Sequence, residues 1–160
     1  MVSSIFSSTT QIDWDALTQG DCFETASRTI TEADVVNFAC LSGDFNRLHV
    51  DREYAASTPF GQRIAHGLLV LSVLSGLTTQ STGYRLLEPS ILALKDIACR
   101  FPKPTFLGDT IRVRVTVQEK RDTGKPDRAE ALFRREAINQ RGEVVVQADF
   151  RMLLRKGGRA

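Results

Sequence analysis

The sequence predicts a single α+β domain in which an antiparallel sheet curls around one buried helix. Three observations predict it: a helix-length segment from Gly67 that is apolar on nearly all sides, four long strand-like segments after it, and short turns between most of them. A soluble helix that is apolar all round must be buried on most sides. Consecutive strands joined by short turns pair antiparallel and form a sheet that can cover such a helix.

The N-terminal third is expected to hold a short strand and a short helix. Residues 1–15 are interpreted as a loose lead-in that Trp14 anchors to the domain, and residues 23–30 as the first strand. Thr31 followed by an acidic residue at the third helical position is a typical helix start. The helix is expected to end at Gly43, because glycine adopts the left-handed conformation that terminates helices.

The remaining elements follow in order. Asp51 is a candidate N-cap of another short helix, which the Pro59-Phe60-Gly61 segment ends. The buried helix comes next, with apolar residues from Leu68 to Leu77. The predicted strands are 91–101, 111–117, 129–138 and 144–154. The domain is therefore expected to span residues 16–154, with a disordered tail at 155–160.

Composition excludes several classes of function. The net charge is only +2 over 160 residues, with basic and acidic residues interspersed, which is not the pattern of a nucleic-acid-binding protein. The three cysteines are scattered, and with only two histidines no metal site is expected. The N-terminus lacks the features of a signal peptide, and no apolar run is long enough to span a bilayer. A cytoplasmic protein without membrane contact is expected.

The residues Asp44 and His49 are the first candidate functional pair. They lie five positions apart in a segment that Gly43 and Asn46 make too irregular for one helix, so a loop can turn both side chains to one point. A carboxylate and an imidazole that share one water can act as a general acid–base pair. The alternative is that Asp44 caps the following turn and His49 is an ordinary half-buried histidine.

The second candidate feature is the start of the buried helix at Ile64-Ala65-His66-Gly67. Backbone N–H groups in a first helical turn lack intrahelical partners and favour negative charge. The Gly67 amide is therefore a candidate oxyanion-binding donor, since glycine permits close approach. The alternative is a tight turn before a core helix. His66 is either a second acid or a hydrogen-bond donor at the helix start, and the structural role is preferred.

Taken together, these motifs resemble those of the MaoC-like dehydratase family, which includes the (R)-specific enoyl-CoA hydratases. The resemblance is carried by 43–46 (GDFN), His49, Asp51, 54–55 (YA), 64–67 (IAHG), 75–77 (SGL) and 101–109 (FPKPTFLGD), and it extends over residues 20–154. It implies a hot-dog fold, in which a sheet wraps a long central helix, and a homodimer whose sheets join.

The resemblance also implies a reaction, the reversible hydration of a trans-2-enoyl thioester to an (R)-3-hydroxyacyl thioester. It implies that Asp44 and His49 hold the water and that the Gly67 amide polarises the thioester carbonyl. Asn46 would shape the loop and Ser75 would support the site by hydrogen bonding. No redox cofactor is expected, because coenzyme A or acyl carrier protein is part of the substrate.

One position departs from the family pattern. Arg47 stands where relatives often carry proline, and it either loosens the loop or faces the phosphates of coenzyme A. Arg100 and Lys103 are further candidate contacts for these phosphates. Two other functions remain open: a hot-dog thioesterase and a non-catalytic subunit that binds acyl thioesters. Thioesterases of this fold often use a carboxylate on the central helix, and residues 68–80 contain no acidic residue, which counts against the first.

Overall fold

The computed structural model describes residues 3–8 and 11–157. Its main feature is one antiparallel sheet with the strand order β1-β4-β5-β6-β3, in which the short β2 also pairs with β4. The bounds are β1 Cys22–Glu24, β2 Arg28–Thr29, β3 Ile91–Arg100, β4 Thr110–Asp122, β5 Arg128–Asn139 and β6 Val144–Arg155. The four long strands confirm the strands predicted for the second half of the chain.

The predicted first strand is split in two. Strands β1 and β2 are separated by residues 25–27, although both pair with β4. At the break, the Thr25 amide donates to the Val113 carbonyl, and the Thr25 hydroxyl accepts a hydrogen bond from the Val113 amide. The Thr25 side chain therefore takes the place of one backbone acceptor in the ladder. The alternation of apolar and polar residues in the sequence does not indicate this break.

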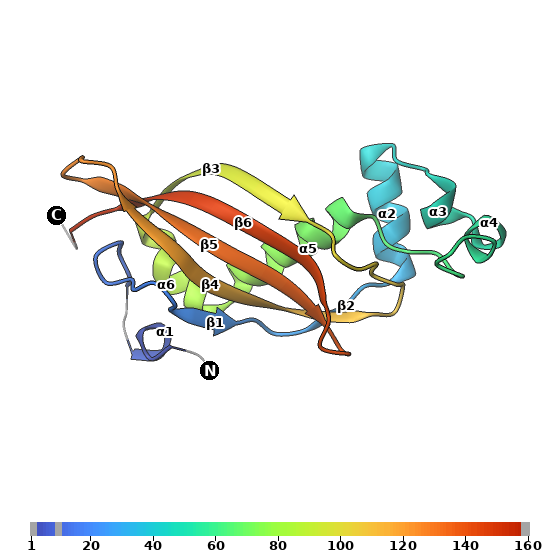
Figure 1. Cartoon of the computed structure of the whole chain (residues 1–160), viewed down its shortest axis with the longest axis horizontal. Coiled ribbons are helices and arrows are strands. Elements are labelled where there is room, and N and C mark those ends of the chain that lie inside the picture. The colour runs from blue at the N-terminus through green and yellow to red at the C-terminus, as the bar shows by residue number, and fades with distance from the viewer. Residues whose placement is uncertain (1–2, 9–10, 158–160) are drawn as a thin grey trace.

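Helix α5, Gly67–Gln80, lies along the concave face of the sheet (Figure 1). Its buried side chains are Leu69, Val70, Val73, Leu74, Leu77 and Thr78, and they pack against core residues of β4, β5 and β6. The sheet wrapped around one helix confirms the predicted α+β class. Leu68 is 61% exposed, so one side of the helix is not covered by its own sheet.

Three short helices gather at the end of the molecule where α5 begins (Figure 1). They are α2 Glu32–Ser42, α3 Arg47–Val50 and α4 Arg52–Ala56. The predicted capping box of α2 is present, with Thr31 as N-cap, and Gly43 ends the helix at φ 76°. Asp51 caps α4 by accepting from the Tyr54 amide, as predicted.

The segment interpreted as a loose lead-in is packed where the structure describes it. Helix α1, Ile5–Ser8, carries the buried Phe6, and Ile12 is fully buried. The indole of Trp14 donates to the Glu130 carbonyl, which makes it an anchor as expected. Residues 1–2 and 9–10 lie outside the described residues.

The C-terminal segment is also more ordered than expected up to residue 157. Arg155 belongs to β6, and the Lys156 ammonium lies 2.8 Å from the Asp122 carboxylate. Residues 158–160 of the expected tail lie outside the described residues. Helix α6, Thr82–Leu87, and the 3-10 turn Glu88–Ser90 connect α5 to β3, and no sequence pattern predicts either of them.

No helix within the described residues is long and apolar enough to cross a membrane.

Candidate active site

Asp44 lies in an exposed turn between α2 and α3. Gly43 gives the chain its change of direction, and the Asp44 amide donates to the Ser42 hydroxyl. The Asp44 carboxylate accepts from the Asn46 amide at 3.2 Å, and Asn46 in turn caps α3 by accepting from the Leu48 amide. Local hydrogen bonds therefore turn the chain after Asp44 directly into the helix that carries His49.

His49 lies in α3 and is half-buried. Its Nδ1 is 2.8 Å from the Ile64 carbonyl oxygen. Because a carbonyl oxygen can only accept, the proton lies on Nδ1, and neutral His49 has an unprotonated Nε2. Burial lowers the pKa of His49 below its ordinary value and the neighbouring His66 lowers it further, while the Ile64 hydrogen bond and Asp44 oppose this. The neutral imidazole is thus the favoured form at pH 7.

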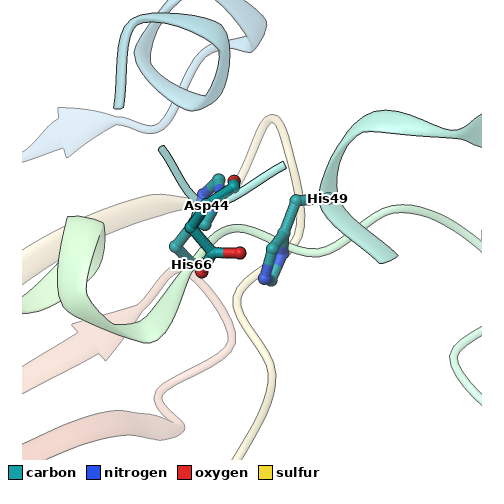
Figure 2. A group of neighbouring side chains, drawn as sticks. All are labelled: Asp44, His49 and His66. Atoms are coloured by element: carbon teal, nitrogen blue, oxygen red, sulfur yellow. The ribbon is translucent and has the colours of Figure 1, made fainter. Parts of the chain in front are cut away.

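The two predicted residues are brought together with His66, as Figure 2 shows. One oxygen of Asp44 and one ring nitrogen from each of the two histidines lie within 4.8 Å of one another. Two atoms that each lie about 2.8 Å from one water oxygen, at a near-tetrahedral angle, are about 4.6 Å apart. A separation of no more than 4.8 Å between Asp44 and His49 leaves both side chains within reach of a single water.

His66 is the residue immediately before α5 and is only 2% exposed. Its Nε2 donates to the Asp44 backbone carbonyl at 2.9 Å, and its buried Nδ1 has no hydrogen-bond partner among the described residues. Its ring lies against that of His49, with 3.8 Å between centroids and 32° between planes. His66 is thus a hydrogen-bond donor at the helix start, as in the preferred structural role, but its partner is the Asp44 carbonyl and not the backbone of α5.

The same three residues are of the types that bind metal ions, and their ligand atoms lie close together. The imidazole lone pairs lie in the ring planes, and stacked rings direct these lone pairs side by side rather than toward one point. A zinc site needs nitrogens that converge on the ion at about 2.0–2.1 Å. The arrangement suits a shared water better than a metal.

A cavity of about 480 Å³ adjoins the site. Its walls are mostly apolar and come from the segment between α4 and α5, from α5 itself, from the segment after β3 and from the start of β6. The lining residues are His49, Phe60, Ile64, Ala65, Gly67, Leu68, Val70, Phe101, Pro102, Lys103, Pro104, Thr105, Val145 and Val146. Asp44 lies beside His49, outside this lining.

Gly67 is the first residue of α5 and faces the cavity. A Cβ on Gly67 would lie 2.8 Å from the ring of Phe101, so the absence of a side chain is what allows Phe101 to cover the helix start. An N–H group in the first turn of a 14-residue helix is a favourable donor to a developing negative charge.

The predicted cations occupy different positions. Lys103 lines the cavity and pairs with Glu143 at 2.6 Å, which helps to lower the pKa of Glu143 to about 2 after the larger effect of Asn139. Arg47 donates twice to Asp51 and stacks on Tyr54, so it ties the loop together instead of loosening it. Arg100 lies at the end of β3 and does not line the cavity.

Ser75 lies two turns along α5 from Gly67, outside the cavity lining. Eight residues of helix correspond to about 12 Å of rise, so the structure does not bring Ser75 next to the Gly67 amide. Phe60, Val145 and Val146 line the cavity but are not among the predicted site residues. They come from distant segments and carry only apolar side chains, so no local motif marks them.

Comparison with known proteins adds independent information. Residues 16–134 match the model of a family described as "MaoC like domain". The chain is 42% identical over 107 residues to Protein MaoC of Klebsiella aerogenes, a match that covers 67% of this chain and 31% of that protein. It is 33% identical over 123 residues to the (R)-specific enoyl-CoA hydratase of Rhodospirillum rubrum, covering 77% of this chain and 78% of that enzyme.

Solved structures give the same result for the fold. A structure described as the monoamine oxidase regulatory protein from Archaeoglobus fulgius superposes with a TM-score of 0.85 at 38% identity, covering 92% of this chain and 96% of that one. A Mycobacterium tuberculosis protein with a double hotdog fold superposes at a TM-score of 0.76 and 21% identity, covering 94% of this chain and 46% of that one. The expected hot-dog fold is confirmed.

Proposed function

Because the chain belongs to the family of proteins with a MaoC-like domain, we propose that it is a hydratase of trans-2-enoyl thioesters. The reaction adds water reversibly across the double bond and yields an (R)-3-hydroxyacyl thioester. The (R)-specific enoyl-CoA hydratase among its relatives supports the reaction class and the choice of R. The observation that carries the proposal is the Asp44–His49 pair, whose carboxylate oxygen and ring nitrogen lie within 4.8 Å of each other beside an apolar cavity.

The protonation of His49 suggests how the pair acts. Its unprotonated Nε2 accepts a proton from the water as the water oxygen bonds to C3 of the substrate. The imidazolium then delivers that proton to C2, which restores neutral His49 and completes the addition. Asp44 accepts a hydrogen bond from the same water and stabilises the positive charge that His49 carries between the two steps.

The electrons of the double bond move in the first step toward the thioester carbonyl, which becomes an enolate. We assign the Gly67 amide as the donor to that oxygen, because it opens α5 at the cavity wall. One donor of this kind is typically worth on the order of 10²–10³ in rate. No electrons leave the substrate, so the reaction needs no redox cofactor. The carrier is coenzyme A or acyl carrier protein, as part of the substrate.

Two other functions are distinguished by one assay. A thioesterase of this fold would use a carboxylate on the central helix, and α5 contains no acidic residue. A non-catalytic role is suggested by the description of one similar structure as a regulatory protein. With crotonyl-CoA, a hydratase removes the enoyl absorbance without releasing thiol. Release of thiol would identify a thioesterase, and no change in either signal would contradict catalysis.

A further inference from the structure

His66 connects three parts of the site that are far apart in the sequence. It precedes Gly67 directly, its Nε2 reaches the Asp44 carbonyl 22 residues earlier in the chain, and its ring lies against His49. It is 2% exposed and is absent from the cavity lining. A side chain in this position can act on the neighbouring groups without touching a substrate.

The hydrogen bond from His66 to Asp44 is the first contribution. The other hydrogen bonds described for the turn are local, from Asp44 to Ser42, from Phe45 to Gly43 and from Asn46 to Asp44. Local bonds fix the shape of a turn but not its place in the molecule. The His66 bond ties the turn to the start of α5, and so places the Asp44 carboxylate relative to the Gly67 amide.

The stacked ring is the second contribution. Two imidazolium rings with centroids 3.8 Å apart would repel each other, so a positive charge on one ring opposes a positive charge on the other. The ring of Phe38 also lies near that of His66, with centroids 5.0 Å apart, and helps to hold it. The other titratable group that acts on His49 is Asp44, which has the opposite effect on its charge.

We propose that His66 is a positioning residue that holds the Asp44 turn with its Nε2–H group and holds the His49 ring by stacking. This inference rests on the proposed hydratase function. A role as a second acid does not fit the geometry, because the Nε2 proton is already donated to a carbonyl and the residue does not reach the cavity.

Two substitutions separate the two contributions. His66→Phe keeps a flat ring against His49 and removes the N–H donor, whereas His66→Gln keeps a donor of similar reach and removes the ring. We expect His66→Phe to lower kcat about 10-fold or more with KM changed less than about 3-fold, because a misplacement near 1 Å can cost 10²-fold. His66→Gln should retain a higher kcat than His66→Phe. Circular dichroism checks that both variants fold.

A second measurement does not depend on activity. The chain has only two histidines, so nitrogen-15 NMR of the imidazoles shows two sets of signals in the wild type and one in either variant. We expect opposite tautomers, with the proton on Nδ1 in His49 and on Nε2 in His66. In His66→Gln the pKa of His49 should rise, because the neighbouring ring that lowers it is gone.

The outcomes are distinct. Opposite tautomers together with the predicted loss of kcat support the proposal. Three results would overturn it: the same tautomer in both rings, an unchanged kcat in His66→Phe, or, in both variants, a rise in KM as large as the fall in kcat. If the wild type turns over no enoyl thioester, the proposed function fails, while the tautomers and the pKa of His49 still decide whether His66 holds its two neighbours. If His66→Phe does not fold, the wild-type tautomers and the His66→Gln variant decide.

Discussion

The chemistry of His49 is set by its immediate neighbours. The Ile64 carbonyl fixes which nitrogen carries the proton, and burial together with His66 lowers the pKa of the ring. A His49 that must be neutral to accept a proton is active above its pKa and inactive below it. The lowered pKa therefore extends the active range of pH downward from that of an ordinary histidine.

Replacing either residue of the proposed pair should abolish most of the activity. We expect Asp44→Asn and His49→Ala each to lower kcat by at least about 10²-fold, since each removes a group that acts on the same water. The double variant should be little worse than the more severe single variant, because residues that act as a unit are not additive. Steady-state kinetics on folded protein measures this, and near-normal turnover in either single variant would refute the assignment.

At this scale the sequence predicted the residue types better than their contacts. Asp44, His49 and Gly67 are candidate site residues because each lies in a short motif within one local segment, and their roles stay predictions. The bond from His66 to the Asp44 carbonyl was not predictable, because it joins a side chain to a backbone atom 22 residues away. Backbone acceptors have no residue identity, so no pattern of side chains marks them.

Among the elements, the start of α5 matters most to the proposed reaction. Gly67→Ala keeps the amide but places a methyl group 2.8 Å from the Phe101 ring, which must then move. We expect kcat to fall about 10-fold, because the displaced ring disturbs the oxyanion position. Gly76→Ala on the same helix is the matched control. A Cβ there meets nothing within 4 Å, so activity should persist and stability should rise by up to about 1 kcal/mol.

A double variant identifies the cause of the loss. Adding Phe101→Ala to Gly67→Ala removes the ring that the new methyl group contacts, and part of the lost kcat should return. Full activity in Gly67→Ala would show that close approach at this position is not needed. Equal loss in Gly76→Ala would show that the effect belongs to the helix as a whole.

The segment after β3 supplies a cation to the cavity. Lys103→Ala should raise KM for an enoyl-CoA by up to about 5-fold at low salt and less at high salt, because the contribution of an exposed ion pair is small and screened. Arg100→Ala is the comparison, since Arg100 lies outside the lining and should leave KM unchanged. A KM that does not respond to Lys103→Ala at any salt concentration would remove Lys103 from carrier binding.

Elements with local signals were predictable and those that depend on packing were not. Thr31 and Gly43 mark the two ends of α2 within the sequence itself. Helix α6 is different, because it contains Gly83, at which a Cβ would lie 2.6 Å from the ring of Phe23. Gly83 is needed because the ring of Phe23, in the distant strand β1, packs against it. In the sequence alone, a glycine only lowers the helix propensity of the segment, so α6 is not predicted.

At the scale of the whole molecule, β3 leaves an open edge on the sheet. It pairs only with β6 in the described part of the chain, and most of its residues are exposed. Leu94 and Ile97 are 49% and 42% exposed, although their partners on β6, Met152 and Phe150, are buried. The apolar face of the sheet therefore extends beyond the strands that α5 covers. An exposed apolar edge strand of this kind favours association with another protein chain.

We expect a homodimer joined along β3, and sedimentation velocity at micromolar concentration tests it. Ile97→Lys should shift the protein toward monomer without unfolding it, because a charge at an exposed edge opposes pairing. Gln118→Lys adds the same charge on β4, away from that edge, and should remain dimeric. A wild type that sediments as a stable monomer would contradict the expected assembly.

The most direct test of the proposed function is chiral analysis of the product that the wild-type protein forms from crotonyl-CoA. A water held by Asp44 and His49 reaches only one face of the double bond once the thioester carbonyl is bound at Gly67, so orientation at three points leaves one productive geometry. We expect (R)-3-hydroxybutyryl-CoA as the predominant product. A predominantly S product, a racemate, or no 3-hydroxybutyryl-CoA at all would contradict it.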